Sequence, residues 1–270
     1  MELSKRLKAL AALAEKGNTA ADIGCDHGYV SIWLAQNNIF SKVIAMDGKS
    51  GPLEAAAKNI RLYHVENKVE LRLSDGLSAL SQGEADSIFC AGMGGALICR
   101  ILSNDPEKVK AMSQVILQPQ SEIHLVRRFL REHGLVITKE DMIKEDGKYY
   151  PMFRAVNREM CRCTFSEKAL DKSDRLDEEE ERGQIPKHLQ DTYDYYGMHL
   201  LKERHPVLHE WLLHERSVNQ DICSGLLKEI DAGKGCGKDS SEDPLLQRKE
   251  GRLRELQEKQ ERIETALAYY

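Results

Sequence analysis

The chain has 270 residues, of which 41% are hydrophobic, which is enough for one sizeable domain with a buried core and an appendage. No stretch approaches the roughly 18 to 20 apolar residues that cross a bilayer, and the first residues lack the apolar stretch and cleavage site of a signal peptide, so we expect a cytoplasmic protein with no membrane partner. The net charge of −5 neither supports nor excludes a nucleic-acid partner, because basic residues can still gather on one face.

Short apolar runs alternate with amphipathic segments between residues 19 and 157, which is typical of a parallel sheet flanked by helices. Among the helices, one has Pro52 at a first helical position and another opens on Ser121 and closes on Gly134. The last two strands are too close for a crossover helix and should form an antiparallel hairpin. The outline predicts an α/β, Rossmann-like, seven-stranded class I methyltransferase fold rather than a dinucleotide dehydrogenase. The expected strands are 19–25, 42–47, 69–73, 87–91, 114–118, 135–143 and 150–157.

The composition changes after residue 157, and three regions follow from it. Residues 1–157 form the predicted catalytic domain, residues 158–192 an acidic linker or insertion, and residues 193–270 a helical arm. Leucines and isoleucines in the arm recur at steps of three, four or seven, and a glycine- and serine-rich break divides them into two helices. We therefore expect an antiparallel, coiled-coil-like pair. Glu215 and Lys249 on its seam indicate that the pair is short or partly open.

Seven cysteines are an odd number scattered through a long chain, and two of them, Cys25 and Cys90, fall in expected strands. This pattern favours reduced thiols over a disulfide framework. Cys161 and Cys163 have no second pair at zinc-finger spacing, so we expect no metal site.

The segment Ala21–Ser31, "ADIGCDHGYVS", resembles a glycine-turn nucleotide loop. Gly24 and Gly28 let the backbone approach a ligand closely. A dinucleotide would place its pyrophosphate near Asp22 and Asp26, and at an effective dielectric near 20 such a like-charge pair at about 4 Å costs on the order of 4 kcal/mol. The sulfonium and ammonium of S-adenosylmethionine would instead be attracted. The segment therefore favours S-adenosylmethionine over NAD.

Three more strand ends carry matching features. Asp47 lies 23 residues after Gly24, the offset of an acid that binds ribose hydroxyls. Asp75 can accept a hydrogen bond from an adenine amine, with Gly76 beside it, and the fourth strand ends in "AGMGG". The carboxyl ends of parallel strands are the edge where open α/β sheets bind ligands. Each feature also has an ordinary structural interpretation: the two acids could be helix caps and the glycines a tight turn.

In order and spacing, "LSKRLKALA", "ADIGCDHGYVS", "SDGL", "GEADSIFCAGMGGALI", "VILQPQ" and "KEDGKYYP" resemble the bacterial tRNA (adenine-N1)-methyltransferases that modify adenine 22. The resemblance covers residues 3–157 and extends to the helical arm, although the acidic stretch is longer than usual. It implies a class I fold, S-adenosylmethionine as methyl donor and tRNA as substrate. Two positions depart from the family: aspartate replaces a common glutamate at residue 47, and Gln120 replaces an asparagine, which puts a role for that amide in doubt.

Residues of the first loop are also the expected catalytic groups. N1-methylation leaves a cationic adenine, which the Asp26 carboxylate could stabilise, while His27 and Tyr29 would contact the base. A turn role for His27 and simple packing for Tyr29 remain as alternatives. The loop "AGMGG" lacks the Asn/Asp-Pro-Pro-aromatic signature of enzymes that methylate exocyclic amines, which favours a ring nitrogen as the acceptor. Motifs and resemblance together predict these cofactor-binding residues: Asp22, Gly24, Cys25, Asp26, His27, Gly28, Asp47, Gly48, Asp75, Gly76, Ala91, Gly92, Met93 and Gly94.

The sequence leaves the partner surface open. Candidates to hold RNA are the helical arm and the basic residues of two segments, for which ordinary solvated helix faces are an equal interpretation: Lys5, Arg6, Lys8, Arg127, Arg128 and Arg131. We expect a monomer. The alternative functions are a methyltransferase for a protein or small molecule, and a non-catalytic RNA-binding or scaffold protein.

Overall fold

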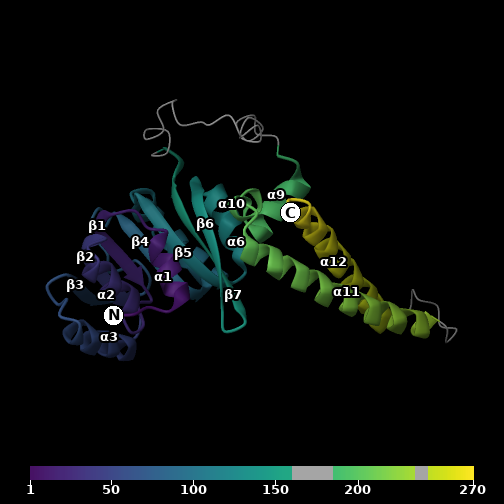
Figure 1. Ribbon diagram of the computed structural model, residues 1–270, viewed down its shortest axis with the longest axis horizontal. Helices are drawn as coiled ribbons and strands as arrows, with labels where there is room; N and C mark the ends of the chain where they lie inside the picture. The colour runs from purple at the N-terminus through teal and green to yellow at the C-terminus, as the bar shows by residue number, and fades with distance from the viewer. Residues whose placement is uncertain (160–184, 235–242) are drawn as a thin grey trace. The chain divides into compact units, whose positions relative to one another are not determined.

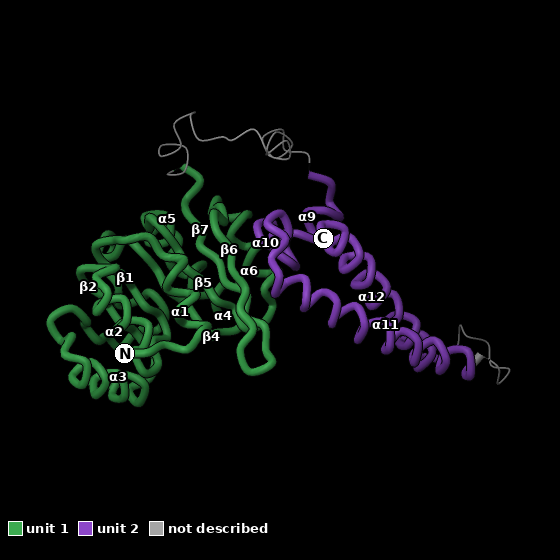
Figure 2. The backbone as a smooth tube through the Cα atoms, in the orientation of Figure 1, with its two compact units in different colours: residues 1–181 green, residues 182–270 purple. Residues whose placement is uncertain are grey.

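The computed structural model describes residues 1–159, 185–234 and 243–270 (Figure 1). The chain divides into two compact units, Met1–Glu181 and Arg182–Tyr270 (Figure 2). Most of the predicted acidic linker, including Cys161 and Cys163, lies outside the described residues.

The first unit is built on a seven-stranded sheet in the order β3-β2-β1-β4-β5-β7-β6. β7 runs antiparallel to both of its neighbours, whereas the other pairings are parallel, so the predicted α/β fold with a terminal hairpin is confirmed. Cys25 was expected inside the first strand and is not, because Gly24 at φ +69° ends the extended backbone. The strands are β1 (Gly17–Ile23), β2 (Phe40–Asp47), β3 (Val69–Leu73), β4 (Ser87–Gly94), β5 (Gln114–Ser121), β6 (Leu135–Glu145) and β7 (Lys148–Asn157).

Alternating side chains of the central strands form two separate cores. Ile88 and Cys90 of β4 belong to one cluster, whereas Phe89 between them belongs to the other. Such a period of two on strands buried on both faces is what parallel sheets require. Helices α1 (Lys5–Ala12), α2 (Tyr29–Gln36) and α3 (Ser50–Leu62) cover one face, and α4 (Gly95–Asn104), α5 (Pro106–Lys110) and α6 (Ile123–Glu132) the other.

The helix expected to open on Ser121 begins two residues later. Ser121 is still in β5, where it pairs with Gly94, and the residue before α6 is Glu122, which has a φ of +51°. The Glu122 carboxylate accepts a hydrogen bond from the backbone N–H of Ala96 at 3.1 Å. Glu122 therefore caps the first turn of α4, and the loops after β4 and β5 are joined at this point.

The second unit contains α9 (Lys187–Tyr196), α10 (Met198–Lys202), α11 (Pro206–Lys234) and α12 (Pro244–Leu267). α9 begins inside the range 158–192 that was predicted as a linker. The long helices α11 and α12 lie side by side and run in opposite directions (Figure 1). The buried Asn219 donates to the Leu256 carbonyl and to Gln260, both at 2.9 Å.

The charges expected to open the helical seam do not do so. Glu215 pairs with Lys259 at 2.5 Å, and Lys249 pairs with Glu229 at 2.8 Å, each across the two helices. The expectation was wrong because an opposite charge on the other helix can neutralise a seam charge that looks disruptive in one helix alone.

In the part of the chain that the structure describes, no helix is long and apolar enough to cross a membrane. Nor do these described residues gather three or more His, Cys, Asp or Glu side chains into a group that could hold a metal ion.

Candidate cofactor-binding edge

The turns after the first four strands meet at one edge of the sheet. β1, β2 and β3 are hydrogen-bonded neighbours, and β4 adjoins β1 on its other side, so their carboxyl ends lie next to one another. This edge carries Gly24, Asp47, Asp75 and Gly92. The structure therefore brings together the four strand ends at which the sequence placed cofactor-binding residues.

The first turn depends on left-handed backbone conformations. Gly24, Asp26 and Gly28 have φ values of +69°, +48° and +72°. The backbone N–H groups of Gly24 and Cys25 donate to the Met46 carbonyl at 2.8 and 3.0 Å, which ties the turn to β2. Gly28 precedes α2 and supplies no side-chain cap, so the start of that helix is not covered by a capping side chain. The result is a close, glycine-lined approach to the strand tip.

Asp22 lies inside the protein, below this turn. It is buried and accepts a hydrogen bond from the Ser31 hydroxyl of α2 at 2.5 Å. Burial raises the pKa of Asp22 to about 6, hydrogen bonds from Ser31 lower it, and the charge of Asp47 raises it further. Asp22 was expected to bind the cofactor, and its carboxylate faces α2. Its observed contact orients the turn.

The three predicted catalytic side chains are exposed beside the turn. The side chains of Asp26 and His27 are 73% and 50% exposed, and an Asp26 oxygen lies 3.8 Å from His27 Nε2. The rings of His27 and Tyr29 are stacked with centroids 5.5 Å apart and an interplanar angle of 23°. Asn59 donates to the His27 carbonyl at 2.9 Å. The backbone is thus anchored while the carboxylate and both rings face outward.

At the end of β2, Asp47 uses half of its carboxylate. Oδ1 accepts from the Lys49 backbone N–H at 3.0 Å, which is an Asx-turn contact just before α3. The other oxygen makes no hydrogen bond to the described residues. Asp47 is therefore not the cap of α3, since Lys49 is the cap residue and that helix has no side-chain cap; one oxygen serves the turn, and the second has no hydrogen-bond partner among the described residues. Gly48 next to it is exposed.

Asp75 after β3 is exposed, and its carboxylate makes no hydrogen bond to the residues that the structure describes. Gly76 follows with φ +57°, and a Cβ there would lie 3.1 Å from the Ile101 side chain of α4. The close packing under Gly76 requires glycine. Asp75 is thus held at the edge with its carboxylate directed to solvent.

The irregular end of β4, residues 91–94, contacts the first turn. Gly92 has a φ of +76°, and the strand register shifts around Met93. The Met93 methyl group covers Gly24, where any Cβ would overlap it, and the Cys90 thiol lies 3.5 Å from the Met93 sulfur. Burial raises the pKa values of Cys25 and Cys90, so both thiols stay protonated in the ordinary pH range.

The motifs of the sequence did not identify a second polar group at this edge, on β5 and β7. The Arg6 guanidinium of α1 donates to Gln118 Oε1 at 2.8 Å and lies over the Tyr150 ring, 5.1 Å from its centroid. The sequence contained a signal for this group: Gln118 is a polar residue inside the apolar run of β5, and it is fully buried. A buried amide must find partners, and Arg6 is one of them.

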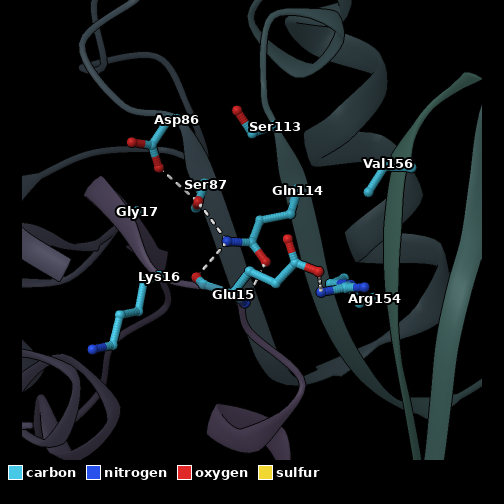
Figure 3. Close-up of a pocket in the computed structure, with 9 residues that line it drawn as sticks. All are labelled: Glu15, Lys16, Gly17, Asp86, Ser87, Ser113, Gln114, Arg154 and Val156. Atoms are coloured by element: carbon cyan, nitrogen blue, oxygen red, sulfur yellow. Dashed lines mark hydrogen bonds and ion pairs between the residues drawn. The ribbon is translucent and has the colours of Figure 1, made fainter. Parts of the chain in front are cut away.

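The amino edge of the sheet carries a cavity of about 230 Å³, shown in Figure 3. Gln114 on β5 exchanges hydrogen bonds with both backbone groups of Glu15 and donates to Ser87, while Glu15 pairs with Arg154 at 2.5 Å. Most of the polar groups that line the cavity are thus bonded to one another. The cavity lies at the ends of the strands opposite to the predicted site residues.

Residues 3–153 match the family described as Methyltransferase domain. The tRNA (adenine(22)-N(1))-methyltransferase of Bacillus subtilis is 35% identical over 155 residues, which are 57% of this chain and 65% of that relative. The match thus spans just under two thirds of the relative's length. A putative tRNA methyltransferase of Mycoplasma pneumoniae is 33% identical over 152 residues, 55% of this chain and 68% of that protein. The crystal structure of the Bacillus subtilis M1A22 tRNA methyltransferase superposes with a TM-score of 0.73 at 26% identity, covering 98% of this chain and 99% of that chain.

Proposed function

Because the chain belongs to the methyltransferase-domain family that its residues 3–153 match, we propose that it transfers a methyl group from S-adenosylmethionine to N1 of adenine 22 in tRNA. The observation that carries the proposal is the row of carboxylates and left-handed glycine turns at consecutive strand tips. The named substrate of the Bacillus subtilis relative supports the choice of tRNA and of the adenine position. A tRNA substrate also agrees with the expected cytoplasmic location.

The chemistry of the edge fits the proposed cofactor, which supplies an electrophilic methyl group on a positively charged sulfur. The free oxygen of Asp47 would accept from ribose hydroxyls, and Asp75 would accept from the adenine amine. Hydrogen bonds to a charged acceptor contribute about 1.5 to 3 kcal/mol each. Gly24 and Gly28 would let the backbone of the turn approach the cofactor, since both have a positive φ and no side chain. Negative charge at the edge would repel a pyrophosphate.

Asp26 is the proposed catalytic carboxylate. Its side chain is exposed at the turn, and one of its carboxylate oxygens lies 3.8 Å from His27 Nε2. An adenine methylated at N1 becomes cationic, so a carboxylate held near the ring stabilises the charge as it develops, or accepts the N6 proton. The left-handed backbone conformation of Asp26 places its Cα on the exposed side of the turn.

His27 and Tyr29 form a stacked aromatic surface next to that carboxylate. A target base must leave its stack before its Watson–Crick edge can react, which costs a few kcal/mol. Aromatic side chains compensate, since base stacking is worth about 1 to 3 kcal/mol per base. The exposed ring pair would therefore receive the extruded adenine and orient it toward the strand tips.

The irregular end of β4 favours a ring nitrogen as the acceptor. Gly92, Met93 and Gly94 provide backbone and a flexible thioether, with no proline or aromatic clamp. A ring nitrogen has an in-plane lone pair and needs mainly positioning, an effect worth up to about 7 to 11 kcal/mol. These residues would line the place where the base and the methyl group meet.

Transfer of labelled methyl groups tests the proposal. The protein is incubated with labelled S-adenosylmethionine and unmodified tRNA transcripts that carry adenine or guanine at position 22. We expect label only in the adenine transcript, with a block to primer extension at that nucleotide, because N1-methylation removes Watson–Crick pairing. Equal labelling of both transcripts would exclude the position, and cofactor binding without transfer to any tRNA would exclude the substrate class.

A further inference from the structure

Arg6 differs from other well-anchored arginines of the first unit. Arg72 pairs with Glu70 and Glu84, Arg127 with Glu140, and Arg154 with Glu15. The partners of Arg6 are neutral: the Gln118 amide oxygen and the Tyr150 ring. Within residues 1–159, 185–234 and 243–270, no carboxylate forms an ion pair with it.

The two neutral partners orient the guanidinium without cancelling its charge. Gln118 is fully buried and directs Oε1 at Arg6 Nη1, 2.8 Å away, while its own amide N–H donates to the Pro119 carbonyl at 3.2 Å. The guanidinium carbon also lies over the Tyr150 ring, 5.1 Å from its centroid. Guanidinium carries five donors in a rigid fork, so several stay available. A partly buried, fixed and uncompensated positive charge is arranged for an anion from outside.

The position of Arg6 on the sheet separates it from the two predicted cofactor carboxylates, Asp47 and Asp75. Gln118 and Tyr150 belong to β5 and β7, whereas the carboxylates Asp47 and Asp75 follow β2 and β3 on the other side of β1 and β4. A Cβ on Gly92, at the tip of β4, would lie 3.8 Å from Arg6 Nη1 and 3.6 Å from Gln120 Nε2. Arg6 therefore stands beside the loop where base and methyl group would meet, on the side away from the cofactor acids.

We propose that Arg6 binds a backbone phosphate of the RNA next to the target nucleotide. The inference rests on the proposed function and deepens it by assigning a contact to the substrate. An extruded nucleotide brings its own flanking phosphates to the site, and a preorganised guanidinium pairs with phosphate oxygens bidentately. The same charge repels the cationic product base, which assists its release.

A carboxylate of the methyl donor is the other anion that could reach Arg6. Phosphate is favoured because Gln118 and Tyr150 hold the guanidinium over β5 and β7, two and three strands from β1. The cofactor acids would anchor the donor's nucleoside on β2 and β3. The two ligands make different predictions, because only an RNA phosphate contact changes the salt dependence of tRNA binding.

The test compares Arg6→Gln, Arg6→Lys and wild type, with Lys110→Gln as the control. Lys110 ends α5 at the amino edge, where its ammonium is paired with Glu107 at 3.0 Å, so this variant removes one positive charge away from the site. Filter binding measures affinity for the adenine-22 transcript over a range of NaCl concentrations, and calorimetry measures affinity for S-adenosylmethionine.

For Arg6→Gln we expect about tenfold weaker tRNA binding and a slope of log K against log salt reduced by about 0.7 to 0.9, the loss of one phosphate contact. Donor affinity should stay within about twofold of wild type, as should all values for Lys110→Gln. Arg6→Lys should keep most of the salt slope but bind tRNA more weakly than wild type. An ammonium keeps the positive charge but lacks the forked donors of guanidinium that bind phosphate bidentately.

Unchanged tRNA affinity and slope in Arg6→Gln would overturn the inference, and so would weakened donor binding with normal RNA binding. If Arg6→Gln weakens both tRNA binding and donor binding, the Arg6→Lys variant decides. A wild-type salt slope for tRNA binding in Arg6→Lys supports the phosphate contact, whereas a reduced slope with normal donor binding contradicts it. Methyl transfer by the wild type is measured alongside. If RNA binding depends on Arg6 but the wild type transfers no methyl group, only the proposed function is excluded. If the wild type transfers the methyl group but RNA binding does not depend on Arg6, only this inference is excluded.

Discussion

The amino and carboxyl edges of the sheet both carry polar side chains but use them differently. At the amino edge, Asp86 accepts from the backbone of Asn18 and Thr19 and from Ser87, and Gln114 uses its whole amide. At the carboxyl edge, the Asp75 carboxylate and one oxygen of the Asp47 carboxylate have no hydrogen-bond partner among the described residues. Polar groups that satisfy each other stabilise the fold, whereas groups left unsatisfied at a rim are available to a ligand.

Asp86→Ala should give the largest effect, on folding. Two backbone N–H groups would lose a charged acceptor at 2.7 and 3.1 Å, and since the site is only partly buried we expect a loss of about 2 to 4 kcal/mol of unfolding free energy. Urea denaturation measures the loss. Asp86→Asn keeps an acceptor oxygen and should recover most of it. The affinity for S-adenosylmethionine should not change. An Asp86→Ala protein with normal stability but weaker S-adenosylmethionine binding would show that the amino edge also serves ligand binding.

The ionised carboxylate of Asp22 at the carboxyl edge should lower the free energy of unfolding, so the size of this effect should depend on pH. Its folded pKa of about 6 exceeds the ordinary value near 4, so between these pH values the folded state binds more protons than the unfolded state. Stability therefore falls as pH rises from 4 to 6, and the full cost, on the order of 2 to 3 kcal/mol, is present above pH 6. The unfolding free energy of wild type minus that of Asp22→Asn, followed by denaturation from pH 4 to 7, should fall by this amount.

The Ser31→Ala variant tests whether the pKa of Asp22 causes the pH dependence of stability. The Ser31 hydroxyl lowers the pKa of Asp22, so its removal should extend the loss of stability to higher pH. A difference between wild type and Asp22→Asn that stays constant with pH would show that the buried carboxyl does not cause the effect.

The sequence was sufficient for the sheet because its signals are local. The apolar runs of β3 match the predicted range, and β4 and β5 begin where expected, because each buried strand shows its own hydrophobicity. Strand ends were less accurate. β4 and β5 continue three residues further, through Gly94 and Ser121, since pairing between two irregular loops extends them and no single-strand pattern reveals such pairing.

The candidate site was predictable where it follows strand ends, and less so where it depends on distant contacts. Asp47 and Asp75 could be placed at the edge from their offsets after apolar runs. The burial of Asp22 depends on Ser31 of the next helix, and the arrangement around Arg6 joins residues 112 and 144 positions apart. Such contacts arise only from tertiary packing, so the sequence could offer Arg6 only as one of several basic residues.

Asp47→Ala tests the carboxyl edge directly and should act on binding instead of folding. Removal of an acceptor for ribose hydroxyls should weaken S-adenosylmethionine binding about 10- to 30-fold, which corresponds to one charged hydrogen bond. Calorimetry gives the affinity. Asp47→Asn keeps an oxygen for the Lys49 backbone contact and separates this turn from the ligand role. Wild-type affinity in Asp47→Ala would refute the ribose assignment.

Asp26→Asn should have the smallest effect and the most specific one. The side chain is 73% exposed and supports no packing, so the free energy of unfolding should stay close to that of wild type. Donor affinity should stay within about twofold of wild type. Its carboxylate is needed only when the adenine becomes cationic, and loss of the charge should lower single-turnover methyl transfer about 5- to 10-fold, or about 1 kcal/mol of barrier. Equal losses in donor affinity and rate would instead place Asp26 among the cofactor ligands. The carboxyl edge would then serve binding alone, and the stabilisation of the charged base would have to come from another group near His27 and Tyr29.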